Sequence, residues 1–129
     1  MVFVQTRLKV VDNSGGYEAM CIGILGKSYR FGKIGDIIVV SIKKIILNRK
    51  VKHQKKKKII KGSVYKGILI RSSNPQKRWG NHWLRGFGNS IAILGNWGLP
   101  LSNRIRGPLF FEIKNTKFSK FSKIGEGII

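Results

Sequence analysis

Hydrophobic and polar residues alternate at the start of the chain, and short apolar runs, most of them rich in β-branched residues, recur along it. The alternating positions Val2 to Val10 share one face of an extended segment, which predicts a half-buried strand. Further strands are expected at 19–25, 36–47, 59–71 and 90–94, because stiff β-branched side chains favour strands over helices. The pattern predicts five strands and no strong helix before residue 100.

Short strands separated by glycine-rich turns are typical of small barrels. Closing the sheet removes the exposed strand edges that would otherwise invite aggregation. We therefore expect an all-β fold, a small closed barrel over about residues 1–98. An open sandwich is the alternative.

The pattern changes after Leu99 and Pro100. Apolar residues now recur at spacings of three to five, which predicts one or two short helices, with Pro108 at a helix start. We expect one domain over residues 1–129, in which a helical part at about 99–129 docks on the barrel.

The charge balance separates this chain from ordinary soluble enzymes. It carries 26 lysines and arginines against five acids, a formal net charge of +21. Such an excess indicates a polyanionic partner, of which nucleic acid is the commonest. The few acids are expected to cap turns or pair with neighbouring bases: Asp12, Glu18, Asp36, Glu112 and Glu126.

A basic tract lies between the third and fourth predicted strands. No acid occurs in it, and it is expected to form a protruding loop or ribbon that contacts phosphates; a solvated tract with no partner is the alternative. Its predicted RNA-binding residues are Arg49, Lys50, Lys52, Lys55, Lys56, Lys57 and Lys58.

A second candidate RNA-binding segment combines aromatic rings with cations. Aromatic faces beside guanidinium and ammonium groups suit the bases of unpaired RNA, through stacking and cation–π contacts. The alternative is that the rings of this segment, with His82 and Phe87, cover the mouth of the barrel. The predicted contacts are Arg71, Lys77, Arg78, Trp79, Trp83 and Arg85.

Residues for catalysis, metal binding or membrane insertion are missing from the pattern. Cys21 stands alone, and His53 and His82 lie far from each other and from any cluster of acids. No base is placed beside a nucleophile, and no set of ligands has metal-binding spacing. No apolar run approaches the ~20 residues that cross a bilayer. We expect no enzyme, no cofactor, no metal site and no membrane partner.

Several short motifs together resemble one protein family. Gln5-Thr6, Val11 to Gly15, Met20-Cys21-Ile22, Gly35 to Ile38 and Gly107-Pro108 occur here in order. This ordered set resembles the universal large-subunit ribosomal protein fourteen, and the resemblance covers nearly the whole chain.

The resemblance implies a five-stranded OB-like barrel with a projecting basic β-ribbon and a short helical C-terminal segment. It also implies a structural role: contact with large-subunit rRNA, a bridge to small-subunit rRNA, and neighbours from the ribosomal protein three and nineteen families. In some systems a ribosome-silencing factor docks on such proteins. The positions that match this docking site are Asn103, which stands where threonine is usual, Arg104 and Lys120.

Two questions stay open at the level of sequence. The abundance of isoleucine, lysine and asparagine indicates an AT-rich coding genome, which favours a mitochondrial ribosome; plastid and bacterial cytoplasm are alternatives. The rival function is a free single-strand nucleic-acid chaperone that uses the same barrel.

Overall fold

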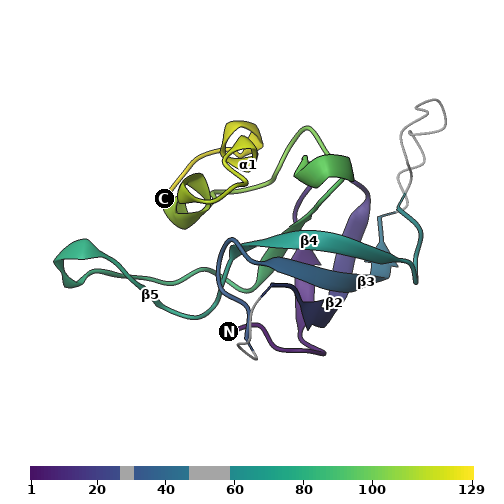
Figure 1. Ribbon diagram of the computed structural model, residues 1–129, viewed down its shortest axis with the longest axis horizontal. Helices are drawn as coiled ribbons and strands as arrows, with labels where there is room; N and C mark the ends of the chain where they lie inside the picture. The colour runs from purple at the N-terminus through teal and green to yellow at the C-terminus, as the bar shows by residue number, and fades with distance from the viewer. Residues whose placement is uncertain (27–30, 47–58) are drawn as a thin grey trace.

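The computed structural model describes residues 1–26, 31–46 and 59–129, and its centre is a closed five-stranded barrel (Figure 1). Closure confirms the predicted barrel over the open sandwich. The first and last strands of the barrel pair in parallel, and the other neighbours pair antiparallel. In barrel order the strands are β1 (Arg7–Val10), β2 (Gly16–Ile24), β3 (Ile37–Ile45), β4 (Val64–Arg71) and β7 (Ser90–Ile93).

The apolar residues form two cores. Alternate residues of β1, β2 and β3 point into the barrel, as the period-two pattern requires, and Leu8, Ala19 and Val40 are fully buried there. A second cluster joins β4 and β7 to the C-terminal part, with Phe110 and Phe121 at its centre. All four residues of β7 are buried because each of its faces meets one of these cores.

Two predicted strands begin later than expected. The alternation from Val2 to Val10 is broken by a turn at Val4 and Gln5, where Gln5 has a positive φ of 70°, so β1 starts at Arg7. Val2 forms an isolated bridge with Gly32 instead. The strand expected at 59–71 begins at Val64, because a turn precedes it at residues 61–62.

The C-terminal part contains two short helices, as predicted: the 3-10 helix η3 (Phe111–Asn115) and α1 (Lys120–Ile124). Pro108 does not start a helix; η3 begins three residues later, and residue 109 forms a bridge with Ile128. Ile105 pairs with both Asp12 and Gly125, which ties this part to the barrel.

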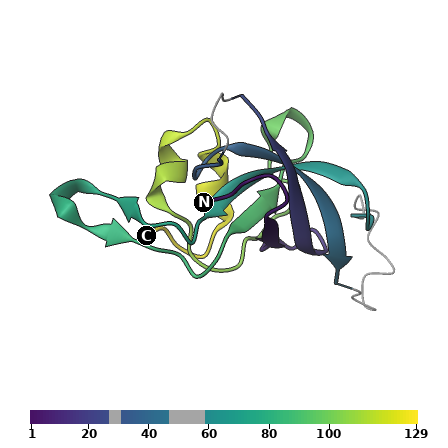
Figure 2. The ribbon, with the colours of Figure 1, turned by 90° about the horizontal axis from the view of Figure 1, so that it is seen from below.

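A hairpin extends from the barrel beyond β4. It consists of β5 (Gln76–Lys77), the 3-10 turn η1 (Trp79–Asn81) and β6 (Trp83–Leu84), and it reaches away from the barrel in both views (Figures 1 and 2). The sequence pattern predicted no strand here, because two-residue strands show no periodicity. The other short element, the 3-10 turn η2 (Asn96–Gly98), follows β7. The basic tract that was expected to project lies, as far as Lys58, outside the residues that the structure describes.

Asp12 completes the seam where β1 meets β7. Its carboxylate accepts a hydrogen bond from the backbone N–H of Ile93, 81 residues away, at 2.8 Å, and others from the N–H and hydroxyl of Ser14. The adjacent carbonyl of Val11 is occupied by the N–H of Arg106. The side chain of Asp12 thus extends the parallel ladder where the backbone of β1 turns away. Burial raises the pKa of Asp12, and these hydrogen bonds oppose the rise.

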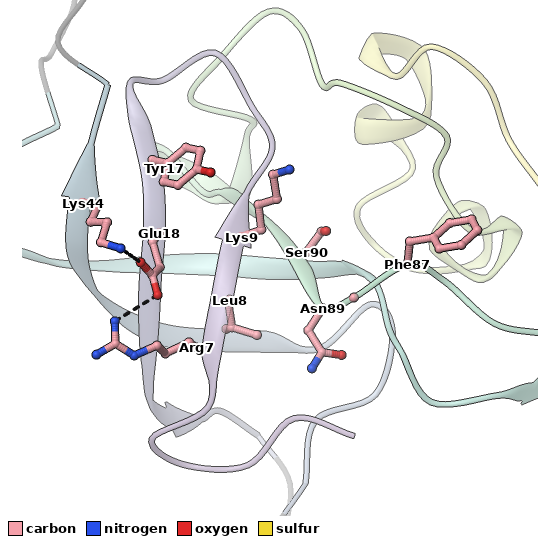
Figure 3. Close-up of a pocket in the computed structure, with 10 residues that line it drawn as sticks. Arg7, Leu8, Lys9, Tyr17, Glu18, Lys44, Phe87, Asn89 and Ser90 are labelled. Atoms are coloured by element: carbon pink, nitrogen blue, oxygen red, sulfur yellow. Dashed lines mark hydrogen bonds and ion pairs between the residues drawn. The ribbon is translucent and has the colours of Figure 1, made fainter.

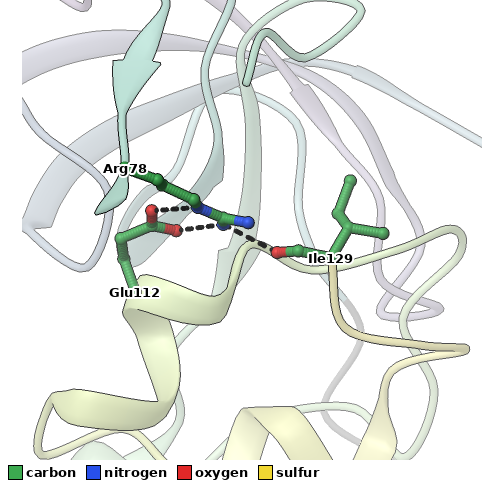
Figure 4. Close-up of polar contacts among 3 residues, drawn as sticks. All are labelled: Arg78, Glu112 and Ile129. Atoms are coloured by element: carbon green, nitrogen blue, oxygen red, sulfur yellow. Dashed lines mark hydrogen bonds and ion pairs between the residues drawn. The ribbon is translucent and has the colours of Figure 1, made fainter. Parts of the chain in front are cut away.

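An ion pair fixes the hairpin to the C-terminal part (Figure 4). Arg78 donates from Nε and Nη2 to the two carboxylate oxygens of Glu112, at 2.9 and 2.8 Å, and from Nη2 to the backbone oxygen of Ile129 at 2.7 Å. Burial raises the pKa of Glu112, but the hydrogen bonds and the guanidinium charge together hold it below its ordinary 4.5. We call this Arg78–Glu112–Ile129 arrangement the clasp.

Replacing Asp12 by asparagine is expected to lower the free energy of unfolding by about 1–3 kcal/mol. The asparagine amide would turn an N–H donor toward groups that need an acceptor, which leaves one of them unsatisfied. Urea denaturation measures the change. Asn13→Ala is the matched control, since the exposed Asn13 contributes a backbone N–H that the substitution keeps. A D12N protein as stable as the unchanged chain would contradict this role.

Replacing Glu112 by glutamine is expected to destabilise the protein by about 1–2 kcal/mol at neutral pH, because it removes a bidentate ion pair that is only partly exposed. The folded-state pKa of Glu112 is depressed, so its contribution is present above the ordinary value of 4.5 and is lost as the pH falls through the folded-state pKa. The stability difference between the two proteins should therefore shrink in acid. Lys114→Gln, on the same helix, should show no such pH dependence, and an E112Q effect that persists in acid would count against the clasp.

Candidate nucleic-acid interface

The β5–β6 hairpin presents its aromatic residues to solvent. Trp79 is 98% exposed and Trp83 is 62% exposed. Lys77 lies opposite Trp83 in the register, and its Nζ is 5.9 Å from the indole centroid. These exposures contradict the alternative in which the rings cover the mouth of the barrel. The hairpin instead offers indole faces beside a cation, an arrangement suited to stacking with unpaired bases.

The hairpin also carries cations that no carboxylate neutralises. The side chains of Lys77 and Arg85 are exposed, and neither forms an ion pair with any residue that the structure describes. His82 is exposed as well, beside the two tryptophans. Unpaired cations on a projecting element are available for phosphate oxygens at little desolvation cost.

Two other predicted contacts already have partners inside the protein. Arg78 is held in the clasp, and its hydrogen bonds to Glu112 raise its pKa. Arg71, at the end of β4, is half-buried and donates from Nη1 to the carbonyl of Pro108 at 3.2 Å. Burial lowers the pKa of Arg71, and the charge of Glu126 opposes this. Both guanidinium groups therefore link the barrel side of the molecule to its C-terminal part.

The seven predicted contacts of the basic tract, from Arg49 to Lys58, lie outside the described residues. Their role in RNA binding stays a prediction from the sequence.

All five carboxylates make contacts within the protein, as the sequence analysis expected. Besides Asp12 and Glu112, Asp36 accepts a hydrogen bond from the N–H of Lys33 at 2.8 Å. Glu18 pairs with Lys44 and Arg7, each at 2.9 Å, and these contacts lower its pKa. Glu126 accepts from the N–H of Gly107 and from Arg104, which lowers its pKa too. The acids hold the fold together and leave the outer surface strongly cationic.

The three residues predicted to contact a silencing factor lie on the C-terminal part. The N–H of Ile105 donates to the carbonyl of Ile124 at the end of α1, so the segment that holds Asn103 and Arg104 runs beside that helix. Lys120 begins the same helix, and all three side chains are exposed. Arg104 is also paired with Glu126 at 3.0 Å.

A groove that the sequence analysis did not predict lies on the outer face of β1 and β2 (Figure 3). It has a volume of about 430 Å³. Arg7, Lys9 and Lys44 supply its cations, and Tyr17 and Phe87 its rings. Phe87 was noticed in sequence as part of the aromatic segment. The groove itself could not be, because it depends on the pairing of β1 with β7.

Within residues 1–26, 31–46 and 59–129 the structure shows no group of three or more metal-binding side chains. The thiol of Cys21 is buried in the barrel, and burial raises its pKa. No helix in these residues is long and apolar enough to span a bilayer.

Comparison with known proteins gives one consistent result. The sequence model of the family described as "Ribosomal protein L14p/L23e" matches residues 1–129. The chain is 43% identical over 128 residues to the "Large ribosomal subunit protein uL14m" of Acanthamoeba castellanii, a match that covers 98% of each chain. It is 44% identical over 115 residues to the protein of the same name in Acanthamoeba polyphaga, which covers 88% of this chain and 97% of the relative.

The match to the family model and the extent of these identities agree with the closed barrel and with the ordered motifs of the sequence. The family is one of structural ribosomal proteins and not of enzymes. This chain belongs to the ribosomal protein L14p/L23e family.

Proposed function

We propose that this chain is a structural constituent of the large subunit of a mitochondrial ribosome, where it binds large-subunit rRNA. The names of its Acanthamoeba relatives support the subunit and the mitochondrial location. The observation that carries the RNA-binding role is that acidic and basic side chains have different partners. The carboxylates are tied into the fold, while the exposed Lys77 and Arg85 have no acidic partner among the described residues.

Charge and shape make different contributions in this proposal. Lysine and arginine contacts to phosphates supply most of the affinity, and stacking on exposed rings selects unpaired nucleotides. On the hairpin the proposed contacts are Lys77, Trp79, Trp83 and Arg85, and the basic tract adds its own phosphate contacts. Arg71 and Arg78 serve instead to position the hairpin and the C-terminal part, because their guanidinium groups are engaged there.

The barrel and the C-terminal part act as one unit in this proposal. The apolar cluster around Phe110 and Phe121 is shared by both, so neither would keep its buried surface alone. The proposed partners are those implied by the family: small-subunit rRNA at an intersubunit bridge, and proteins of the ribosomal three and nineteen families. A silencing factor would contact α1 through Lys120, and the segment beside this helix through Asn103 and Arg104.

Salt dependence tests the RNA-binding role of the hairpin. Binding of the full chain to a cognate large-subunit rRNA fragment should weaken with salt, with a log-log slope of roughly −0.7 to −0.9 per phosphate contact. Neutralising Lys77 and Arg85 together by glutamine should reduce the magnitude of that slope by about 1.5, as expected for two lost contacts. The charge-conserving variant K77R/R85K is the matched control and should keep the slope. If K77Q/R85Q leaves the slope unchanged, these cations do not contact the RNA.

Sedimentation separates the ribosomal role from that of a free chaperone. A structural constituent is expected to remain with the large subunit through a high-salt sucrose gradient, because many contacts must be broken together. A chaperone bound only through phosphates would be released, since each of its contacts is weakened by salt. Recovery of the chain only in the soluble fraction would contradict the proposal.

A further inference from the structure

We propose that the groove on the outer face of β1 and β2 is a second RNA-binding site, which takes an unpaired stretch of RNA with a base against Phe87 and phosphates on Arg7, Lys9 and Lys44. This inference deepens the proposed function and rests on it, because it assigns a distinct part of the surface to RNA. None of these residues belongs to the hairpin or to the basic tract.

Two of the three cations of the groove, Arg7 and Lys44, are held in place before any ligand arrives. Glu18 lies between Arg7 and Lys44 and pairs with each at 2.9 Å, so its single negative charge fixes two positive groups (Figure 3). Lys9 lies opposite Glu18 in the β1–β2 register, yet it forms no ion pair with the residues that the structure describes. Three cations and one carboxylate give this side of the groove a net charge of +2, which favours the binding of phosphate groups.

The aromatic end of the groove is exposed to solvent. Phe87 is fully exposed and follows the sharp hairpin by three residues, and the next residue, Gly88, has a positive φ of 97° that lets the chain turn there. Figure 3 draws Phe87 at the opposite end of the groove from the cluster of Arg7, Glu18 and Lys44. An RNA strand laid along the groove would therefore meet a ring at one end and cations at the other.

The two walls of the groove are joined by backbone hydrogen bonds. The N–H of Lys9 donates to the carbonyl of Asn89 at 3.0 Å, and Lys9 pairs with Ser90 in the parallel ladder. The side-chain oxygen of Asn89 accepts from the N–H of Ser73 at 3.0 Å, which leaves its amide N–H groups directed away from that contact. A groove with fixed walls loses little conformational entropy on binding.

The chemistry favours RNA over an apolar partner, and unpaired RNA over a duplex. A phenyl ring can stack on the face of a base only where that base is not already stacked in a helix. The groove is also close to the hairpin: only two residues lie between Leu84 and Phe87, so the three steps of chain that join them span at most about 11 Å. One strand of RNA can reach both.

The test compares binding of the full chain to two labelled probes, a single-stranded oligouridine of about ten nucleotides and a fully paired RNA duplex of the same length. Phe87→Ala is expected to weaken binding of the single strand about tenfold and to leave the duplex unchanged, because stacking on one ring is lost. Because Phe87 is fully exposed, its substitution should not disturb folding. Trp97→Ala, which removes a 96% exposed ring outside the groove, is the matched control and should change neither affinity.

A second pair of variants tests the cationic wall. Lys9→Gln should reduce the magnitude of the salt slope for the single strand by about 0.7, whereas Lys9→Arg should keep it. The assignment is overturned if the unchanged chain binds the single strand and F87A binds it equally well, or if F87A weakens both probes alike; the proposed function then survives through the hairpin. If the unchanged chain binds neither probe at low salt, the proposed function fails together with the groove.

Discussion

Repulsion among like charges is the constraint that the rest of this structure has to satisfy. The chain carries a formal charge of +21 on 129 residues, and folding brings its cations closer together than they are in the unfolded state. Such charges interact over a Debye length of about 10 Å at 0.1 M salt. The five carboxylates are correspondingly placed where segments join: at the barrel seam, across β1 to β3, before β3, at the clasp and beside Gly107.

This placement separates the surface into parts with different roles. The C-terminal part covers the outer faces of β4 and β7, so the apolar residues on those faces, Ile68, Ile70 and Ala92, belong to the second core. The outer face of β1 and β2 stays open, and the hairpin projects from the barrel (Figure 2). Four exposed rings lie on these open parts, beside cations that internal acids either fix or leave unpaired: Trp79 and Trp83 on the hairpin, and Tyr17 and Phe87 in the groove. A surface of this kind is stabilised by a polyanion that covers it, which agrees with membership in a family of ribosomal proteins.

Much of the barrel could be predicted from the sequence because its signals are local. The β-branched run from Ile37 to Ile45 marks a strand wherever it occurs, and the turn residues after Val10 mark a reversal. The break at Gln5 could not be predicted, since a left-handed glutamine has no signature in composition. Pro108 was misleading because its segment pairs with the chain end before η3 begins.

The candidate sites also divide into those with a local sequence signal and those that depend on the fold. The exposed tryptophans of the hairpin were found because aromatic and basic residues are interleaved in sequence. The clasp and the groove were not, because each depends on partners brought together by the fold: Arg78 and Glu112 are 34 residues apart, and the groove requires β1 to lie beside β7. The pairing of Arg78 could not be inferred from composition, because no acid lies between Asp36 and Glu112 in the sequence and every arginine in that stretch looked equally available.

The thermal stability of the purified chain as a function of monovalent salt shows whether repulsion among its cations limits the fold. Raising the salt from about 0.05 M to about 0.5 M shortens the Debye length severalfold. If uncompensated repulsion limits the stability of the free protein, the melting temperature should therefore rise. A short polyphosphate should raise it further at low salt. A melting temperature that stays constant, or falls, over the same range would show that repulsion among the cations does not limit the stability of the fold.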